Sequence, residues 1–391
     1  MTMKDYNFLQ TKYTVNTYVN RGLTLTRGNG PFLYTDQNEA YLDFMTNYGV
    51  NIFGYNHPKL TQALHKQADK LITLHGSFIN DMRAQSSEAL IKKCGEPYSQ
   101  VYWSNSGAES IETALKFAPL VTKRHHFLSL TNAYHGKSHG ALSITHNHKY
   151  RRPFQKNLLS TTFIEFNNAQ LIERSITQDT AALIIEPIQG EGGINIPDPN
   201  YLQEIKKTCT KHNILLIIDE IQSGLGRTGT FLASQQYQTT GDILCLGKGL
   251  AGGLPVGATI VTKEIGLHIP KGIQTSTFGG NPLACALALE TIQLINDDIL
   301  NHINKIGKIL LEKIYRVKHE NIIQIRGKGL MVGIEIKKNR NNIIKQLQNN
   351  HILVAPAAEN VIRLLPPYII NEQHVTEFTN TFTNILTIET D

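Results

Sequence analysis

The chain has 391 residues, of which 41% are hydrophobic and 18% charged, with a formal net charge of +6. This length accommodates two domains, or one large domain with a smaller lobe, and the composition is that of a globular protein with a full core. No nucleic-acid-binding motif accompanies the densest basic cluster, Lys149, Arg151 and Arg152. We interpret this cluster as a solvated or anion-facing surface and expect no nucleic-acid partner.

Cysteine usage and hydropathy indicate in which cellular compartment the protein works. The N-terminus lacks the apolar core of a signal peptide, and no apolar run approaches the ~18 residues of a bilayer-spanning helix. We therefore predict a cytoplasmic protein with no membrane partner and no metal. Four scattered cysteines, without the spacing of a disulfide framework or a zinc site, are expected to be buried thiols: Cys94, Cys209, Cys245 and Cys285.

The first hundred residues predict few regular elements. Residues 1–20 show little periodicity and are expected to form an arm that needs a partner surface. Short strands are expected near Arg27 and at Tyr41–Phe44, followed by an amphipathic helix at about His57–Leu74.

Further along, apolar strands alternate with helical stretches such as Tyr201–His212. Strands without polar alternation indicate a mainly parallel sheet covered by helices on both faces, which is an α/β fold. The predicted strands are Val101–Ser104, Phe127–Leu130, Ala181–Ile185, Ile214–Ile218, Ile243–Leu246 and Ala258–Thr262.

From about Pro282 the pattern becomes helical, and strand-like segments follow at 322–336 and 362–365. These segments indicate a second, smaller α+β lobe. We expect an N-terminal arm with part of the small domain at 1–50, a large cofactor-binding domain at 51–281 and a C-terminal small domain at 282–391.

Lys248 stands at the end of the predicted strand Ile243–Leu246, with a glycine on each side. Burying an unpaired ammonium is costly, and desolvation lowers its pKa, which makes a nucleophilic amine available near neutral pH. Such a lysine suits an imine link with an aldehyde. The alternative is a solvated lysine on a surface loop, and this stretch alone does not decide between them.

Other polar groups follow the other predicted strands, where ligands of open parallel sheets bind. Asn105-Ser-Gly-Ala-Glu begins a helical run, and the free amides and positive dipole of such a helix start suit a phosphate. Ser and Gly are also ordinary N-cap residues, so this signal is weak by itself. The remaining strand ends carry Tyr134-His-Gly, Glu186, Gln189-Gly-Glu191 and Asp219-Glu-Ile-Gln222.

Together these groups suit pyridoxal phosphate. This cofactor needs a lysine for its aldehyde, a phosphate cup and a carboxylate that keeps the ring nitrogen protonated. Asp219, which follows an apolar strand, is expected to be a buried carboxylate in need of a cationic partner, and the protonated ring nitrogen is such a partner. Tyr134 is placed to stack on one face of the ring, and Ile221 to press on the other.

From about residue 20 to residue 375, the chain resembles the class III (ω-amino acid) aminotransferases. These enzymes belong to fold type I of the pyridoxal-phosphate-dependent transferases. The resemblance implies a mostly parallel central sheet in a large domain and a smaller α+β domain. It rests on Asn105-Ser-Gly-Ala-Glu, Tyr134-His-Gly, Glu186-Pro-Ile-Gln-Gly-Glu-Gly-Gly, Asp219-Glu-Ile-Gln-Ser-Gly-Leu-Gly-Arg-Thr-Gly, Leu246-Gly-Lys-Gly, Ser276-Thr-Phe-Gly-Gly-Asn-Pro and Arg363-Leu-Leu-Pro-Pro.

The resemblance implies roles at the cofactor. Lys248 would form the covalent link and then act as the base for the 1,3-proton shift, and Asp219 would pair with the ring nitrogen. Thr277 would reach the phosphate of a neighbouring subunit, which implies a homodimer with shared sites. The implied cofactor site also includes Ser106, Gly107 and Ala108 at the phosphate, Tyr134, His135, Glu186 and Ile221 around the ring, and Gln222 near the phenolic oxygen.

It also implies roles at the substrate. Arg363 would bind a substrate α-carboxylate through its bidentate fork. Glu191 would pair with this arginine when an ω-amine donor presents no carboxylate there. That exchange lets one site handle two half-reactions, with 2-oxoglutarate as the acceptor.

The acetylornithine aminotransferases of the family resemble the chain most, and N2-acetylornithine is the leading hypothesis for the donor. One position departs from them. Lys137 stands where these enzymes and the ornithine enzymes usually carry an arginine for the donor's α-carboxylate, and lysine keeps the charge but loses the fork. The same loop resembles that of putrescine aminotransferases, and Tyr48 resembles a tyrosine of ornithine δ-aminotransferases. Diamine, ornithine, acetyl-lysine and 4-aminobutyrate donors therefore remain alternatives.

Other classes of function fit the sequence less well. A P-loop requires four residues between its glycines and a Ser or Thr after the lysine, whereas here Gly241 precedes Gly247 by six positions and Gly249 follows Lys248. A cofactor-binding transcription regulator would add a DNA-binding domain, for which residues 1–50 are too short. A same-fold aminomutase would have less use for Glu191 with Arg363.

Overall fold

The structure is a computed structural model that describes residues 5–388, and its largest sheet has seven strands. Six of these strands are parallel to one another, and β10 alone runs antiparallel to its two neighbours, β4 and β9. The strand order is β4 (Tyr98–Ser104), β10 (Gly257–Thr262), β9 (Ile243–Leu246), β8 (Leu215–Asp219), β7 (Thr180–Ile185), β5 (His126–Leu130) and β6 (Thr161–Ile164).

The prediction of a mainly parallel α/β sheet is confirmed. Each of the six predicted strands lies largely within one of its strands. The antiparallel direction of β10 has a physical reason. Only residues 247–256, with the short 3-10 helix η3 (Lys248–Ala251), join β9 to β10, and a parallel crossover needs a dozen residues or more.

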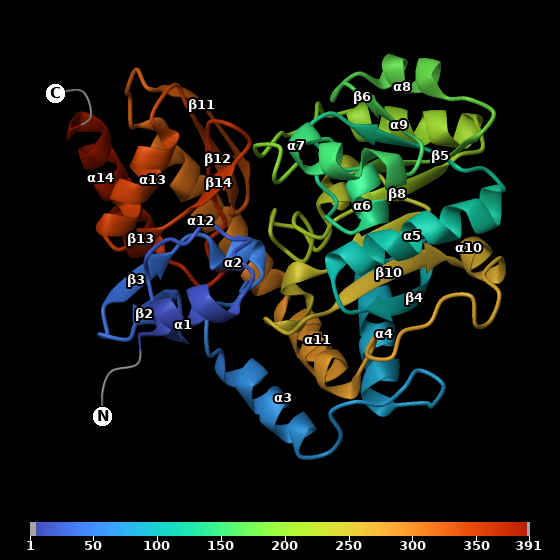
Figure 1. Cartoon of the computed structure of the whole chain (residues 1–391), viewed down its shortest axis with the longest axis horizontal. Coiled ribbons are helices and arrows are strands. Elements are labelled where there is room, and N and C mark those ends of the chain that lie inside the picture. The colour runs from blue at the N-terminus through green and yellow to red at the C-terminus, as the bar shows by residue number, and fades with distance from the viewer. Residues whose placement is uncertain (1–4, 389–391) are drawn as a thin grey trace.

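Apolar side chains on both faces of the sheet explain why its strands lack polar alternation. Successive residues of β8 point into two different clusters, with Leu216 in one and Ile217 in the other. Helix α5 (Gly107–Thr122) covers one face through residues such as Ile111. Helix α9 (Tyr201–Lys211) belongs to the other cluster, and Figure 1 shows the sheet enclosed between such helices.

The predicted helix at about 57–74 ends earlier than expected, because α3 spans only Pro58–Ala68. The apolar pattern continues through Leu71 and Ile72, but both side chains are exposed. No core surface covers them, so nothing offsets the entropy of extending the helix.

Two four-stranded sheets lie beside the large one, and Figure 1 shows them on the side of the molecule that also carries α14 (Glu372–Ile388). Strand β13 (Ile352–Leu353) pairs in parallel with β3 (Ala40–Asp43), which joins the C-terminal part of the chain to its N-terminal strands. The first sheet also contains β1 (Leu25–Asn29) and β2 (Phe32–Thr35), and the second contains β11 (Ile322–Lys328), β12 (Met331–Ile336), β15 (Val361–Leu364) and β14 (Ala355–Ala357).

The remaining helices complete the fold. Helix α11 (Pro282–Leu294) packs against α3, η3 and α4 (Asp81–Cys94). The predicted domain boundary after residue 281 stays a prediction. No helix within residues 5–388 combines the length and the hydropathy needed to cross a bilayer. The other helices are α1 (Tyr6–Tyr13), α2 (Thr46–Gly49), α6 (His139–Ser143), α7 (His148–Arg151), η1 (Arg152–Asn157), α8 (Ala169–Ser175), η2 (Ala233–Tyr237), α10 (Lys263–Leu267), α12 (Asp297–Tyr315), α13 (Arg340–Asn349) and α14 (Glu372–Ile388).

Candidate active site

Lys248 lies at the carboxyl end of β9, as the first residue of η3, and its φ of 43° is unusual for a residue other than glycine. Burial, together with the nearby Arg363 guanidinium, lowers the pKa of its amine to about 8, whereas the carboxyl groups of Asp219 and Glu186 act in the opposite direction. A lysine in this environment is not a solvated surface lysine. It offers a substantial fraction of neutral amine near physiological pH.

Glycines bring the lysine next to the start of α5. A Cβ on Gly247 would lie 3.0 Å from the Cα of Gly107, the first residue of that helix. A Cβ on Gly107 would lie 2.9 Å from two side-chain carbons of Ile221. The first-turn amides of Gly107 and Ala108 have no partner within the helix, so they are available to an anion at this point.

The hydroxyl of Ser106 has a local task. It accepts a hydrogen bond from the backbone N–H of Glu109 at 3.2 Å and so caps α5.

A buried polar cluster lies at the ends of β7 and β8. The Nδ1 atom of His135 lies 2.7 Å from Oδ2 of Asp219, while Oδ1 accepts a hydrogen bond from the backbone N–H of Ile221 at 2.9 Å. Burial raises the pKa of the neighbouring Glu186, whose two oxygens accept backbone hydrogen bonds from Tyr134 and Gly190, each at 3.1 Å. The Asp219 carboxylate is held in one orientation by these contacts.

These groups fit pyridoxal phosphate. The structure brings a neutralisable lysine, free helix-start amides and a fixed, buried carboxylate to one edge of the sheet. The half-buried Tyr134 and Ile221, which lies close to Gly107, would supply the two apolar surfaces that a flat ring needs. Burial raises the pKa of the Tyr134 phenol to about 12, so it stays uncharged.

Arg363 lies on β15 and is fully buried. Its Nη2 atom lies 2.7 Å from Oε2 of Glu191, and its Nη1 donates a hydrogen bond to Oε1 of Gln222 at 3.0 Å. The guanidinium also lies 5.4 Å from the ring centre of Tyr48. Gln222, which was expected near the cofactor's phenolic oxygen, thus contacts Arg363, the residue predicted to bind the substrate carboxylate.

Tyr48 reaches this position through a left-handed turn. Thr46, Asn47 and Tyr48 all have positive φ angles, between 47° and 59°. Such a run is costly for residues other than glycine, and here the backbone N–H of Thr46 donates to the buried Asp43 carboxylate, while its hydroxyl donates to the carbonyl of Leu365.

Lys137 is exposed, and its Nζ atom lies 4.3 Å from the ring centre of Tyr150. Tyr150 was missed by the sequence interpretation, which treated the neighbouring basic cluster as a solvated surface. Its ring meets that of Tyr134 edge to face, with 6.5 Å between centroids. An aromatic residue between two basic ones was the available signal.

Thr277 is the one predicted site residue that stands apart. It is exposed, and no hydrogen bond in the described part of the chain joins it to the groups around Lys248. Its neighbour Ser276 accepts a hydrogen bond from the side chain of Asn105 at 3.2 Å. Its predicted role on a neighbouring subunit therefore stays a prediction.

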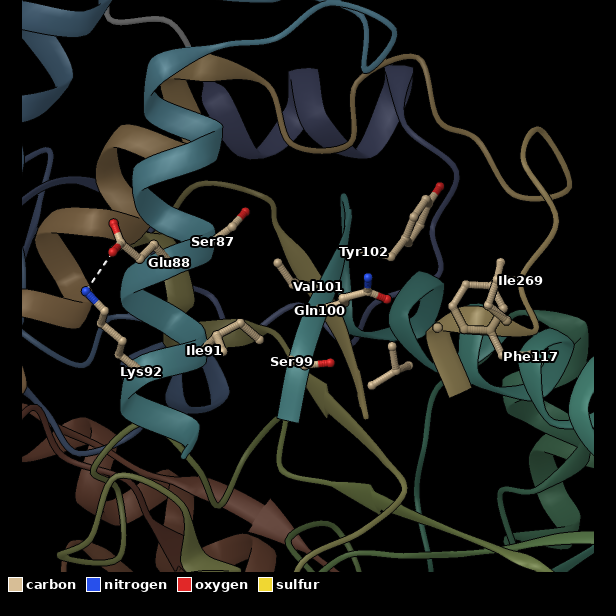
Figure 2. Close-up of a pocket in the computed structure, with 12 residues that line it drawn as sticks. Ser87, Glu88, Ile91, Lys92, Ser99, Gln100, Val101, Tyr102, Phe117 and Ile269 are labelled. Carbon is tan, nitrogen blue, oxygen red and sulfur yellow. Dashed lines mark hydrogen bonds and ion pairs between the residues drawn. The ribbon is translucent and has the colours of Figure 1, made fainter. Parts of the chain in front are cut away.

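A separate cavity of about 640 Å³ opens at the edge strand β4 (Figure 2). Side chains of α4 line one side and Phe117 and Ile269 line the other, and Figure 2 shows the exposed pair of Glu88 and Lys92 at its rim. None of the predicted site residues lines this cavity.

Comparison with known proteins identifies the family. The family model described as aminotransferase class-III matches residues 13–386. The chain belongs to the class III aminotransferases. It is therefore a transaminase that depends on pyridoxal phosphate, and the proposed fold type is confirmed.

Individual relatives of this class III aminotransferase cover nearly the whole chain. The acetylornithine aminotransferase of Methanosarcina acetivorans is 37% identical over 366 residues, 93% of this chain and 92% of that protein. The solved ornithine aminotransferase of Toxoplasma gondii is 30% identical with a TM-score of 0.94, over 98% of this chain and 95% of that one, and the same enzyme has been solved with PLP partially occupying its active site. The acetylornithine aminotransferase of Elizabethkingia anophelis is 30% identical with a TM-score of 0.88, over 98% of both chains.

Proposed function

We propose that this class III aminotransferase moves the terminal amino group of N2-acetylornithine, or of a similar ω-amino substrate, to 2-oxoglutarate, giving a semialdehyde and glutamate. The observation that carries the proposal is the ion pair of the buried Arg363 with Glu191, beside a second cation, Lys137. The similarity to the Methanosarcina enzyme named acetylornithine aminotransferase supports the same donor.

The ion pair suits a site that accepts two kinds of substrate. In an ω-amino donor the reacting carbon carries no carboxylate, and Glu191 then neutralises Arg363. With glutamate or 2-oxoglutarate, the substrate α-carboxylate takes the place of Glu191. Glu191 is the partner able to move, because its side chain is 37% exposed whereas that of Arg363 is 0% exposed.

The remaining groups of this chain hold the cofactor and move the proton. Bound pyridoxal phosphate supplies an aldehyde for the amino group and a ring that withdraws electrons from the reacting carbon. Asp219, oriented by His135, would hold the ring nitrogen in its protonated state, and the amides of Gly107 and Ala108 would hold the phosphate. The Lys248 amine would move the proton between the reacting carbon of the substrate and the aldehyde carbon of the cofactor.

A diamine such as putrescine is the second candidate donor. The observation that favours it is Lys137 itself, because a lysine lacks the bidentate fork that holds a carboxylate in a fixed direction. A diamine has no carboxylate to hold. The resemblance of Tyr48 to a tyrosine of ornithine enzymes and the likeness to the Toxoplasma ornithine enzyme support ornithine as a further alternative.

We also propose a homodimer that shares its active sites, in the cytoplasm. Large apolar side chains are exposed on the two loops next to Thr277 and α4, and a second copy would cover them. The 98% exposed Ile79 and the 60% exposed Phe278 are the clearest examples. Sedimentation of the holoenzyme should give a dimer, and a fully active monomer would contradict the shared site.

The donor is tested by the product. Purified enzyme with 2-oxoglutarate should form glutamate fastest with N2-acetylornithine, and mass spectrometry should detect the N-acetylated semialdehyde. For comparison, the same assay is run with ornithine, putrescine and 4-aminobutyrate as donors at the same concentrations. Faster glutamate formation from putrescine would replace the leading proposal with the diamine alternative.

A further inference from the structure

Two of the predicted substrate residues, Arg363 and Lys137, carry a positive charge. Arg363 is paired with Glu191, whereas Lys137 forms no salt bridge with any residue between 5 and 388. Its contact within this part of the chain is the face of the Tyr150 ring, 4.3 Å from the ammonium. The ammonium is thus available to an anion on the side away from the ring.

Tyr150 is itself fixed in the structure. It lies on α7, and its ring meets Tyr134 edge to face at 77° between the ring planes. The next residue, Arg151, lies with its guanidinium 4.5 Å from the ring centre of Phe163 on β6. Phe163 also contacts the ring of His146 at 5.3 Å. These contacts fasten α7 to the edge of the large sheet.

The surroundings of Tyr150 place it in the substrate pocket. Burial raises the pKa of its phenol, and Glu191 and Tyr48 raise it further, so both groups act on this one ring. The ring therefore lies near two predicted substrate residues, Glu191 and Tyr48, and contacts a third, Lys137.

A lysine side chain benefits more than an arginine side chain from a neighbouring ring that holds it in one orientation. Its ammonium is a compact charge on a flexible stem, and holding the stem in one rotamer costs entropy on every binding event. A ring face that attracts the ammonium orders it before the ligand arrives. The ring thereby supplies the direction that the missing guanidinium fork would have given.

We propose that Tyr150 is a positioning residue for Lys137, and that the pair selects donors with a carboxylate at the end remote from the reacting amine. This inference rests on the proposed function, because it assumes that the donor carries such a carboxylate. In this arrangement the ring holds the ammonium, the ammonium binds the carboxylate, and the terminal amine extends toward Lys248.

Two donors that differ only in the carboxylate test the inference. 5-Aminopentanoate is the ornithine chain without its α-amino group, and pentylamine lacks the carboxylate as well. With the holoenzyme, Tyr150→Leu should raise the KM for 5-aminopentanoate about three- to tenfold, the range expected for losing a partly buried cation–π contact. Its kcat for that donor, and both constants for pentylamine, should change less than twofold.

Two further variants separate positioning from general damage. Tyr150→Phe keeps the ring face and should keep the wild-type KM for 5-aminopentanoate. In a Lys137→Met background, Tyr150→Leu should add less than a twofold change, because the contact is already gone. Equal effects of Tyr150→Leu on both donors, or full additivity with Lys137→Met, would overturn the inference.

The same assay separates this inference from the proposed function. A wild-type enzyme that favours 5-aminopentanoate over pentylamine, with a Tyr150→Leu effect that is equal for both, contradicts only the role of Tyr150. A wild-type enzyme with equal KM values for the two donors contradicts the carboxylate-bearing donor and the role of Tyr150 together.

Discussion

The two ends of the candidate site are built differently. At the ring-nitrogen end, Asp219 and His135 are buried and extend from the ends of parallel strands or the turns that follow them. At the donor end, the exposed Lys137 and the partly exposed Glu191 lie in loops, and their contacts are with Tyr150 on α7 and Arg363 on β15. In our proposal the buried end performs chemistry that is common to the family, whereas the exposed end would select the substrate. Changes at the exposed end should then alter specificity with little effect on the fold.

The largest expected effect is at the buried end. Lys248→Ala should lower kcat at least about 1,000-fold (about 4 kcal/mol) for every donor alike, because the proton-transferring amine is lost. Steady-state rates with N2-acetylornithine and pentylamine measure this. Bound cofactor should remain detectable by absorbance, and a variant that still links the cofactor to the protein after borohydride reduction would show that another lysine is used.

Arg363 connects the two ends, and its removal should distinguish the two half-reactions. Arg363→Ala should raise the KM for 2-oxoglutarate about 30-fold or more, since a charge-assisted bidentate contact is lost. The KM for a diamine should change far less. Initial rates over a range of acceptor and donor concentrations provide both values, and equal increases would refute the assigned role.

Lys137→Arg should have a smaller effect that is confined to the donor end. It restores the guanidinium fork, so the KM for N2-acetylornithine should fall about three- to fivefold, while the KM for putrescine should stay the same or rise. Lys137→Met serves as the matched control and should act in the opposite direction on N2-acetylornithine. A fall in both KM values would show that Lys137 does not contact the donor carboxylate.

The smallest effect concerns the stability of the buried end. Burial raises the pKa of Glu220 to about 7, above an unfolded value of about 4.3, so the folded protein favours the protonated form. Its contribution is therefore present below about pH 4.3 and is lost as the pH rises through about 7. Glu220→Gln should lose part of the fall in Tm between pH 5 and pH 8.

The exposed Glu88, which pairs with Lys92, supplies the control for this measurement. Glu88→Gln should leave the pH dependence of Tm as it is in the wild type. An unchanged slope in Glu220→Gln would mean that this buried carboxyl group is ionised in the folded protein throughout the range.

The same contrast explains what the sequence could predict. Asp219 and Lys248 each end an apolar strand, and carboxyl ends of parallel strands meet at one edge, so their proximity follows from the pattern. The contact of His135 with Asp219 and that of Tyr150 with Lys137 depend on side-chain directions in loops, which periodicity does not encode. The pairing of Glu191 with Arg363, 172 residues apart, was expected only from the family resemblance.

The fold shows a similar limit. Six of the seven strands of the large sheet were predicted because both of their faces are apolar, as the two clusters around β8 demonstrate. The edge strand β6 was not predicted, because most of its residues are only partly buried or exposed. The end of α3 was predicted wrongly because its apolar pattern continues into Leu71 and Ile72, which remain exposed. Periodicity indicates which residues could be buried, but only the packed structure determines what covers them.

A single-turnover experiment separates the two candidate donors. The holoenzyme is mixed with N2-acetylornithine or with putrescine, without an acceptor, and the loss of the aldehyde-form absorption of the cofactor is followed by stopped flow. We expect N2-acetylornithine to convert the cofactor at least about ten times faster than putrescine at equal concentration. Faster conversion by putrescine would mean that Lys137 marks a diamine pocket, and it would contradict the account.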